Sequence, residues 1–152
     1  MSLVMVLPPA LESDLQRTAG LTMFEYTVLA NLSEADQATL RMSDLAYRAN
    51  SSLSRLSHVV SRLARRGLVI KRACSTDGRV CEVVLTKAGS AKVVDAAPHH
   101  VARVRDLVIH SLTPAQLTSL GHAAAAISDR IADVTSSTGP ADFIRDWSGP
   151  VG

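Results

Sequence analysis

The sequence is poor in aromatic residues and in cysteine. Aromatic side chains make up only 3% of its 152 residues, so aliphatic side chains must fill the core, which favours helices packed through apolar stripes. The two cysteines, Cys74 and Cys81, are too few for a disulfide framework and have no partners at zinc-ligand spacing. An aromatic cage and a disulfide-stapled scaffold are therefore excluded.

Long apolar runs and catalytic motifs are also missing. No run approaches the roughly 18 residues that a membrane helix needs, and the apolar N-terminus has neither a basic start nor a cleavage site, so we expect a soluble, cytoplasmic protein. The chain has no nucleophile elbow, phosphate-binding glycine loop or paired carboxylates in an apolar setting. Its histidines lack neighbours at ligand spacing. The sequence therefore predicts no enzyme activity, no cofactor and no metal site.

Positive charge is concentrated in the middle of the chain. Between Arg41 and Lys92 there are eleven basic and three acidic residues, a net charge of +8, whereas the remainder carries −6. Such segregation is typical of a surface that binds a polyanion, and the acidic flanks discourage binding elsewhere. Charge alone leaves a merely solvated basic face as an equal alternative.

Residues 52–66 form the most informative segment of that basic region. Apolar residues spaced three or four apart predict a helix with one buried stripe: Leu53, Leu56, Val60 and Leu63. The face opposite that stripe is polar, with small hydroxyls, His58 and cations, and no acid occurs between Ser51 and Arg66. A helix exposed only for solubility usually carries pairs of opposite charge, so this face is suited to anions and base edges.

Turn and cap residues place this helix in a winged helix-turn-helix. Ser43 is expected to cap a short helix before it, and Gly67 to end it. Two strands should follow, joined by a two-residue turn at Asp77 and Gly78. Helices are further predicted over residues 8–19, 22–34, 87–110 and 114–134, with Pro98 kinking the third. The expected fold is mainly α with a small β-hairpin wing and a helical dimerisation body.

The second helix of such a motif enters the major groove, which assigns roles to individual side chains. The candidates for base edges lie near the helix N-terminus: Ser54, Arg55 and His58. The candidates for phosphates are Ser52, Ser57 and Arg62. At the wing tip, Arg79 is placed to enter a minor groove, with Asp77 holding it in position.

The sequence resembles the MarR family of bacterial transcription regulators over roughly residues 11–131. The resemblance rests on LTMFEYTVLANL, MSDLAYRAN, the helix ending RLARRGLV, the DGR wing, LTKAG and LTPAQL. It implies a homodimer that reads a palindromic double-stranded operator and represses until a small aromatic or phenolic ligand releases it. A pocket for that ligand is expected around Leu15, Tyr26, Leu29 and Arg48.

The expected organisation is one compact domain overall. It comprises an N-terminal dimerisation helix (1–20), the winged DNA-binding module (21–86), C-terminal dimerisation helices (87–135) and a tail (136–152). The outer helices carry more apolar surface than a winged module needs, which favours a dimer over packing within one chain.

Two alternatives remain at this point. A winged helix can also act as a protein-interaction module that does not bind DNA. Cys74 and Cys81 would face each other across a two-residue turn, so a thiol-redox switch in the wing is a second alternative. Structural or incidental cysteines are favoured over it, because a disulfide at a hydrogen-bonded pair tends to be strained.

Overall fold

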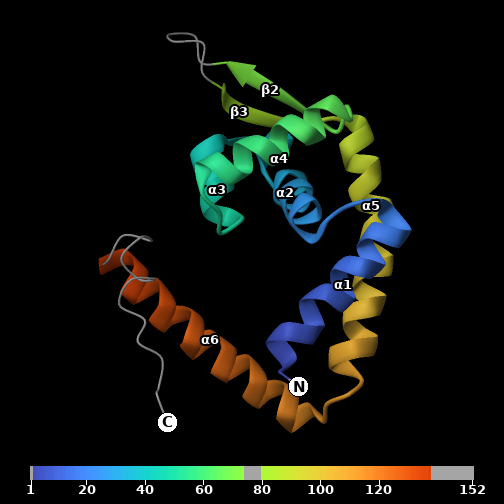
Figure 1. Ribbon diagram of the computed structural model, residues 1–152, viewed down its shortest axis with the longest axis vertical. Coiled ribbons are helices and arrows are strands. Elements are labelled where there is room, and N and C mark those ends of the chain that lie inside the picture. The colour runs from blue at the N-terminus through green and yellow to red at the C-terminus, as the bar shows by residue number, and fades with distance from the viewer. Residues whose placement is uncertain (1, 74–79, 138–152) are drawn as a thin grey trace. The chain divides into compact units, whose positions relative to one another are not determined.

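Helices make up most of the chain, with one small sheet (Figure 1). The computed structural model describes residues 2–73 and 80–137. It divides into two units, Met1–Leu107 and Val108–Gly152, and each is described by itself. The elements of the first unit are α1 (Leu3–Ala19), α2 (Met23–Ser33), the 3-10 turn η1 (Asp36–Ala38), β1 (Thr39–Arg41), α3 (Met42–Arg48), α4 (Leu53–Arg65), β2 (Val69–Ala73), β3 (Val80–Leu85) and α5 (Lys87–Val104). A π-helical turn, η2 (Arg105–Ile109), follows α5, and α6 (Pro114–Ser137) lies in the second unit.

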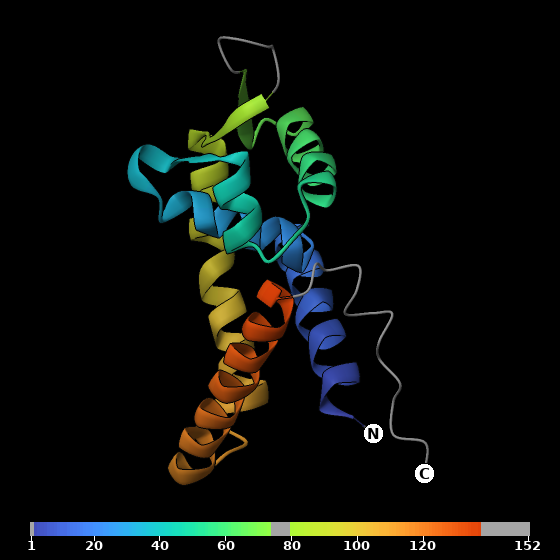
Figure 2. The ribbon, with the colours of Figure 1, turned by 90° about the vertical axis from the view of Figure 1, so that its left-hand side faces the viewer.

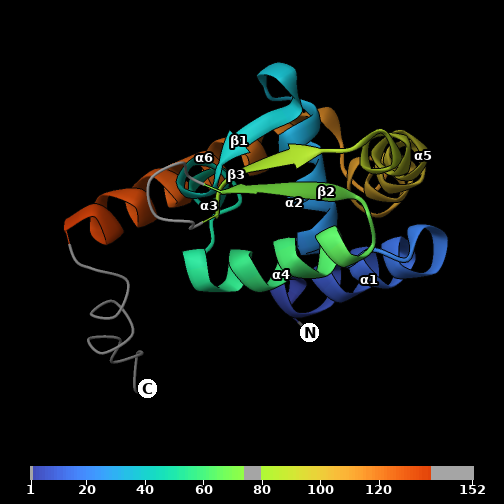
Figure 3. The same ribbon diagram turned by 90° about the horizontal axis from the view of Figure 1, so that it is seen from above.

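The three strands form an antiparallel sheet in the order β1-β3-β2. Figure 3 shows α4 lying alongside β2 and β3, with β1 at the far edge of the sheet. α3, a short turn and α4 form the helix-turn-helix, and Asn50 in that turn has a positive φ of 47°. The predicted mainly α winged helix-turn-helix is therefore confirmed.

The wing differs from its predicted register by one residue. A two-residue turn at Asp77 and Gly78 would place Arg72 opposite Val83, but Arg72 lies opposite Glu82, and the pairing shifts again after Arg72. The register expected at the base of the wing was therefore wrong by one residue, whereas the two-residue turn itself falls outside the described residues and stays a prediction. The predicted opposition of Cys74 and Cys81 depended on this register, and Cys74 lies outside the described residues.

The core lies where α2, α3, α4 and the sheet meet. Leucine and valine side chains fill it, and the largest fully buried ones include Leu21, Leu29, Leu32, Leu45, Leu56, Leu63 and Val83. α1 packs along α5 (Figure 1) and adds Leu15 to the same core. The helix-turn-helix and the hairpin therefore share one apolar interior that holds α4 against the sheet.

Three helix starts were predicted by their caps and are confirmed. Thr22 and Glu25 form a capping box at α2, and the side chains of Ser52 and Thr86 accept backbone N–H groups at α4 and α5. The predicted cap by Ser43 is wrong. Arg41 occupies that position without a side-chain cap, and the Ser43 hydroxyl lies 3.3 Å from Asp44 instead.

Helix boundaries and burial depart from prediction at two further places. α1 begins at Leu3, with Pro8 and Pro9 inside it, because proline's preference for a first turn does not prevent a helix from forming before it. In α4, Leu53 is 56% exposed and Val59 is buried in its place, because the core covers α4 only from Leu56 onward.

The start of α5 is fixed to the end of α4. The Thr86 hydroxyl donates to the carbonyls of Gly67 (2.7 Å) and Leu68 (3.0 Å), and the Gly89 N–H donates back to that hydroxyl at 3.0 Å. A Cβ at Gly89 would lie 2.1 Å from the Leu68 oxygen, so only glycine allows this approach. α5 continues through Pro98 to Val104 and is followed directly by the π-helical turn η2, which ends at Ile109, one residue before the predicted helix end at His110.

Candidate nucleic-acid interface

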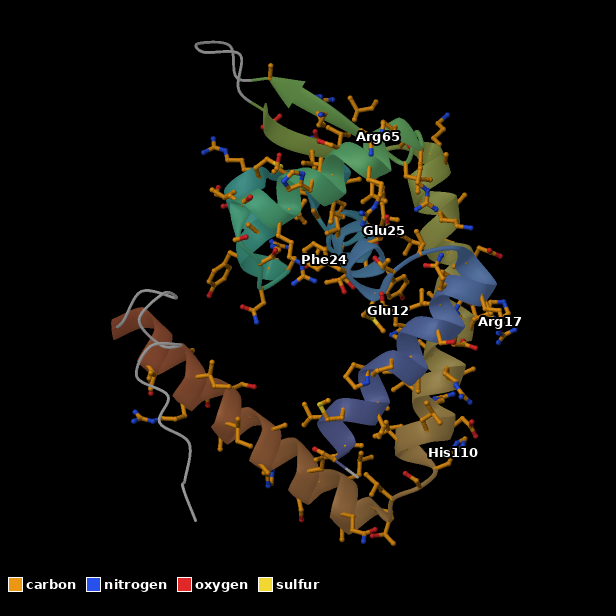
Figure 4. All side chains as sticks on the ribbon, viewed as in Figure 1. Glu12, Arg17, Phe24, Glu25, Arg65 and His110 are labelled. Carbon is orange, nitrogen blue, oxygen red and sulfur yellow. The ribbon has the colours of Figure 1, made fainter. Side chains whose placement is uncertain are left out.

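α4 presents one apolar and one polar face, and the polar face is open to solvent. Its buried side chains are Leu56, Val59, Val60 and Leu63. The opposite side exposes predicted DNA-contacting residues: Ser54, Ser57 and His58. Arg65 lies on the same side near the C-terminus of the helix and is also exposed (Figure 4). The predicted acid-free surface therefore exists as a continuous outward face.

Ser52 fixes the beginning of that face. Its hydroxyl accepts the backbone N–H of Arg55 at 3.2 Å, as expected of an N-cap. The N–H groups of this first turn point along the helix axis and favour an anion there. Ser52 is itself exposed, so its predicted position near a phosphate is sterically open.

Lys71 adds a cation to the α4 face from the hairpin. Its Nζ donates to the Ser61 hydroxyl at 3.3 Å, which links β2 to the middle of α4. Sequence reasoning assigned Lys71 no role. The sequence did show a lysine four residues after Gly67, the residue that ends the helix. Whether that lysine lies next to α4, however, depends on how the hairpin packs against the helix. β2 and α4 lie side by side (Figure 2), so Lys71 and the cations of α4 belong to one surface.

Arg62 was expected to hold a phosphate, but it lies on the flank of α4 that faces α2. Its Nε donates to Glu25 Oε1 at 2.7 Å, and Glu25 is only 3% exposed. Arg66 approaches the other carboxylate oxygen at 3.4 Å and donates to the Gly20 carbonyl at 3.0 Å. The Arg62 side chain remains 48% exposed, so its role at a phosphate stays a prediction for the nitrogens outside this ion pair.

Glu25 is ionised despite its burial. Burial by itself would raise the pKa of Glu25. The N–H of Thr22, the hydrogen bond from Arg62 and the positive charges of Arg62 and Arg66 together outweigh burial and hold the pKa below its ordinary value. The sequence revealed the capping box, but the ion pair joins residues 37 positions apart and could not be read from local spacing.

Arg55 contacts α2 through an aromatic ring. Its guanidinium carbon lies 4.4 Å from the centroid of the Phe24 ring, a cation–π distance. Figure 4 labels Phe24 and Glu25 on α2, below α4. Sequence reasoning identified Arg55 as a base reader and missed Phe24. The only sign of Phe24 in the sequence was that it is an aromatic residue in the first turn of a capped helix, in a chain with few aromatics.

Comparison with known proteins identifies the family of this helical scaffold. The MarR family model matches residues 21–81. The structure of AbsC, a MarR family transcriptional regulator from Streptomyces coelicolor, has a TM-score of 0.78 and 42% sequence identity, covering 86% of this chain and 87% of AbsC. The chain belongs to the MarR family of transcriptional regulators.

Two further MarR-type relatives show how far the similarity extends. Sco3205, a MarR family transcriptional regulator from Streptomyces coelicolor whose structure was determined in complex with DNA, has a TM-score of 0.79 and 37% identity, covering 84% of this chain and 83% of Sco3205. The HTH-type transcriptional regulator MhqR of Bacillus subtilis (strain 168) is 30% identical over 90 residues, 59% of this chain. That match spans 60% of MhqR, which is less than two thirds of its length.

The wing of this MarR protein is described only at its base. Asp77 and Arg79, the two wing-tip residues predicted to contact DNA, lie outside the described residues. At the base, Arg72 and Glu82 are opposite each other, and their nearest charged atoms lie 4.0 Å apart. The two side chains are 59% and 40% exposed to solvent, so this ion pair contributes little to stability.

The four residues expected around an effector do not line one described pocket. Leu15 and Leu29 are fully buried in the core, and Arg48 is exposed at the end of α3. A shallow pocket of about 410 Å³ lies between α1 and α5 instead, lined by Asp14, Arg17, Thr18, His99, Ala102, Arg103 and Asp106. The predicted ligand role of the four residues therefore remains a prediction.

Tyr26 is half-buried and contacts α5. Its ring centroid lies 5.0 Å from that of His100, at an interplanar angle of 53°. Burial raises the pKa of Tyr26, assisted by the negative charge of Glu34. Burial lowers the pKa of His100, partly opposed by Asp14, so the imidazole favours its neutral form here.

The described helices have no membrane-spanning candidate. None of them has both the length and the apolar character that crossing a bilayer requires. Within the same residues, no three His, Cys, Asp or Glu side chains are grouped so that they could hold a metal ion.

Proposed function

We propose that this MarR-family protein is a sequence-specific double-stranded DNA-binding transcription regulator. The observation that carries the proposal is the acid-free outward face of α4, to which Lys71 is joined from β2. One α-helix fits the width of the major groove, and a face of hydroxyls, imidazole and cations matches base edges and flanking phosphates.

The roles of individual residues follow from their places on α4. Ser54, Arg55 and His58 are assigned to base edges, because they lie in its exposed first half. Ser52 and Ser57 are assigned to phosphates, with Arg62 contributing the part of its guanidinium that Glu25 does not engage. Asp77 and Arg79 are assigned to the wing tip and a minor groove.

We further propose that the protein acts as a homodimer on a palindromic operator. In α6 the apolar side chains of Leu120 and Ile127 are 41% and 61% exposed, and Leu3 and Met5 at the start of α1 are 59% and 73% exposed. Exposed apolar stripes of this kind mark interaction surfaces. In this arrangement residues 1–20 and 87–135 form the dimer body, residues 21–86 bind DNA, and residues 136–152 are a tail.

A small aromatic or phenolic ligand is proposed to release the protein from its operator, which would make it a repressor. Ligand-responsive repression is typical of the MarR family. The half-buried Tyr26 and exposed Arg48 are the members of the predicted set that retain surface for such a ligand. Thermal-shift measurements with a panel of aromatic acids test this part, and the absence of a shift with every member would contradict it.

Titration of DNA at two salt concentrations tests the main proposal. Duplexes enriched from a randomised library are labelled, and binding is measured by fluorescence anisotropy at low and at physiological salt. We expect affinity to fall steeply with salt, because phosphate contacts release counterions. Arg17→Ala is the matched control for the Arg55→Ala variant that follows. It also removes one arginine, but from α1, where the Arg17 side chain is 73% exposed and lies far along the chain from α4.

The rival function predicts a different result. A folded protein that binds no enriched duplex, or binds without a salt dependence, would refute DNA binding and favour a protein-interaction module. Arg55→Ala should reduce discrimination between the enriched duplex and a scrambled duplex more than it weakens nonspecific binding. An equal loss on every duplex would refute the base-reading role of Arg55.

A further inference from the structure

The first turn of α2 is unusually well fixed. The Thr22 hydroxyl accepts the Glu25 N–H at 3.1 Å, and the Glu25 carboxylate accepts the Thr22 N–H at 2.9 Å. Phe24 lies between these two residues, partly buried and packed against the core. Its ring is therefore attached to backbone that has little freedom to rotate.

This turn contacts α4 at two places. The Arg55 guanidinium carbon lies 4.4 Å from the Phe24 ring centroid, and Glu25 pairs with Arg62 at 2.7 Å. Residues seven positions apart in a helix lie on the same flank, about 10 Å apart along its axis. Contact at both points opposes rotation of α4 about its own axis, which would otherwise change which side chains face outward.

Arg55 is held at both of its ends. Its backbone N–H donates to Ser52, and its guanidinium lies over the Phe24 ring. No described ion pair engages Arg55, and the residue is exposed. An aromatic ring takes up none of the guanidinium N–H donors in a conventional hydrogen bond, so these donors stay available to the two acceptors of guanine.

We propose that Phe24 is a positioning residue that determines sequence specificity: its ring orients the Arg55 guanidinium for base recognition, without itself touching DNA. This inference rests on the proposed function, in which Arg55 reads bases. Orienting a flexible side chain before binding reduces the ordering that DNA must impose, and it favours the one base whose acceptors match that orientation.

The test compares five proteins on two duplexes. Wild type, Phe24→Leu, Phe24→Tyr, Arg55→Ala and the double variant that carries both Phe24→Leu and Arg55→Ala are titrated with the enriched duplex and its scrambled counterpart. Specificity is measured as the ratio of the dissociation constant for the scrambled duplex to that for the enriched duplex. Phe24→Leu should lower this ratio about threefold to tenfold, while Phe24→Tyr, which keeps the ring, should preserve it. Adding Phe24→Leu to Arg55→Ala should lower the ratio no further, because there is then no guanidinium to orient.

The outcomes separate this inference from the proposed function. If Arg55→Ala lowers the ratio and Phe24→Leu does not, Phe24 has no positioning role although Arg55 reads bases. If Phe24→Leu weakens binding to both duplexes equally, its role is structural only. If Arg55→Ala leaves the ratio unchanged, the base-reading role fails and Phe24 has nothing to position.

A measurement on the unaltered protein keeps the inference testable if Phe24→Leu does not fold. Protons on the Arg55 side chain that lie over an aromatic ring should show upfield-shifted NMR resonances. We expect that shift in the wild type and its persistence in Phe24→Tyr. Resonances at ordinary positions in the free wild-type protein would overturn the stacked geometry.

Discussion

Replacing Glu25 by glutamine should destabilise the protein at neutral pH without removing the cap of α2. The amide oxygen of glutamine can still accept the Thr22 N–H, but the negative charge facing Arg62 (2.7 Å) and Arg66 (3.4 Å) is lost. A hydrogen bond between charged groups contributes about 1.5–3 kcal/mol. Because both arginines are partly exposed to water, we expect a value at or just below the lower end of that range, about 1–2 kcal/mol at pH 7.

The difference between wild type and Glu25→Gln should depend on pH in a defined direction. The pKa of Glu25 in the folded protein lies below its ordinary value of 4.5. Its charge therefore contributes fully above the unfolded pKa, and this contribution is lost as the pH falls through the lowered folded value. The gap in the free energy of unfolding should be largest near pH 7 and should shrink below about pH 5.

Urea denaturation followed by circular dichroism measures that gap at a series of pH values and at one protein concentration. Glu12→Gln is the matched control, because Glu12 is an exposed glutamate on α1 (Figure 4). It should change the free energy of unfolding by less than about 0.5 kcal/mol at every pH. A Glu25→Gln protein as stable as wild type at pH 7, or a gap that widens in acid, would refute the assigned ion pair.

Three further predictions follow from other contacts. Gly89→Ala should destabilise the protein by about 1–3 kcal/mol, since its Cβ would lie 2.1 Å from a backbone oxygen, whereas Ser90→Ala at the exposed neighbouring position should be nearly neutral in thermal melts. Lys71→Ala should weaken binding to the enriched and scrambled duplexes alike and lower the salt slope by about one; a loss confined to one duplex would contradict a phosphate contact. Ile127→Asp should halve the mass measured by sedimentation, because it charges a side chain that is 61% exposed in the single chain, and an unchanged mass would exclude α6 from the dimer contact.

Features that depend on neighbouring residues were predictable from the sequence. The caps at Thr22, Ser52 and Thr86 need only a hydroxyl within three residues of a backbone N–H. The end of α4 at Gly67 needs only a residue that tolerates the observed φ of 71°. The outward polar face of α4 followed from helical periodicity, because apolar residues on one side leave the other side to water.

Features that depend on several elements at once were not predictable. Leu53 fits the apolar period of α4 yet is 56% exposed, because the described core covers that helix only from Leu56 onward. The observed pairing register of β2 and β3 differs by one residue from the predicted register, because it follows from the packing of the strands as well as from the turn.

The sequence by itself determined that this chain has a capped helix with an acid-free outer face, in a basic segment that resembles a MarR module. Only the tertiary structure decided what the cations around that face contact: Arg62 pairs with Glu25, Arg55 lies over the Phe24 ring, and Lys71 reaches α4 from the hairpin. The physical reason is the separation along the chain between the interacting residues. Caps and periodicity are fixed by contacts within one or two helical turns, whereas these side chains are oriented by partners that only folding brings near.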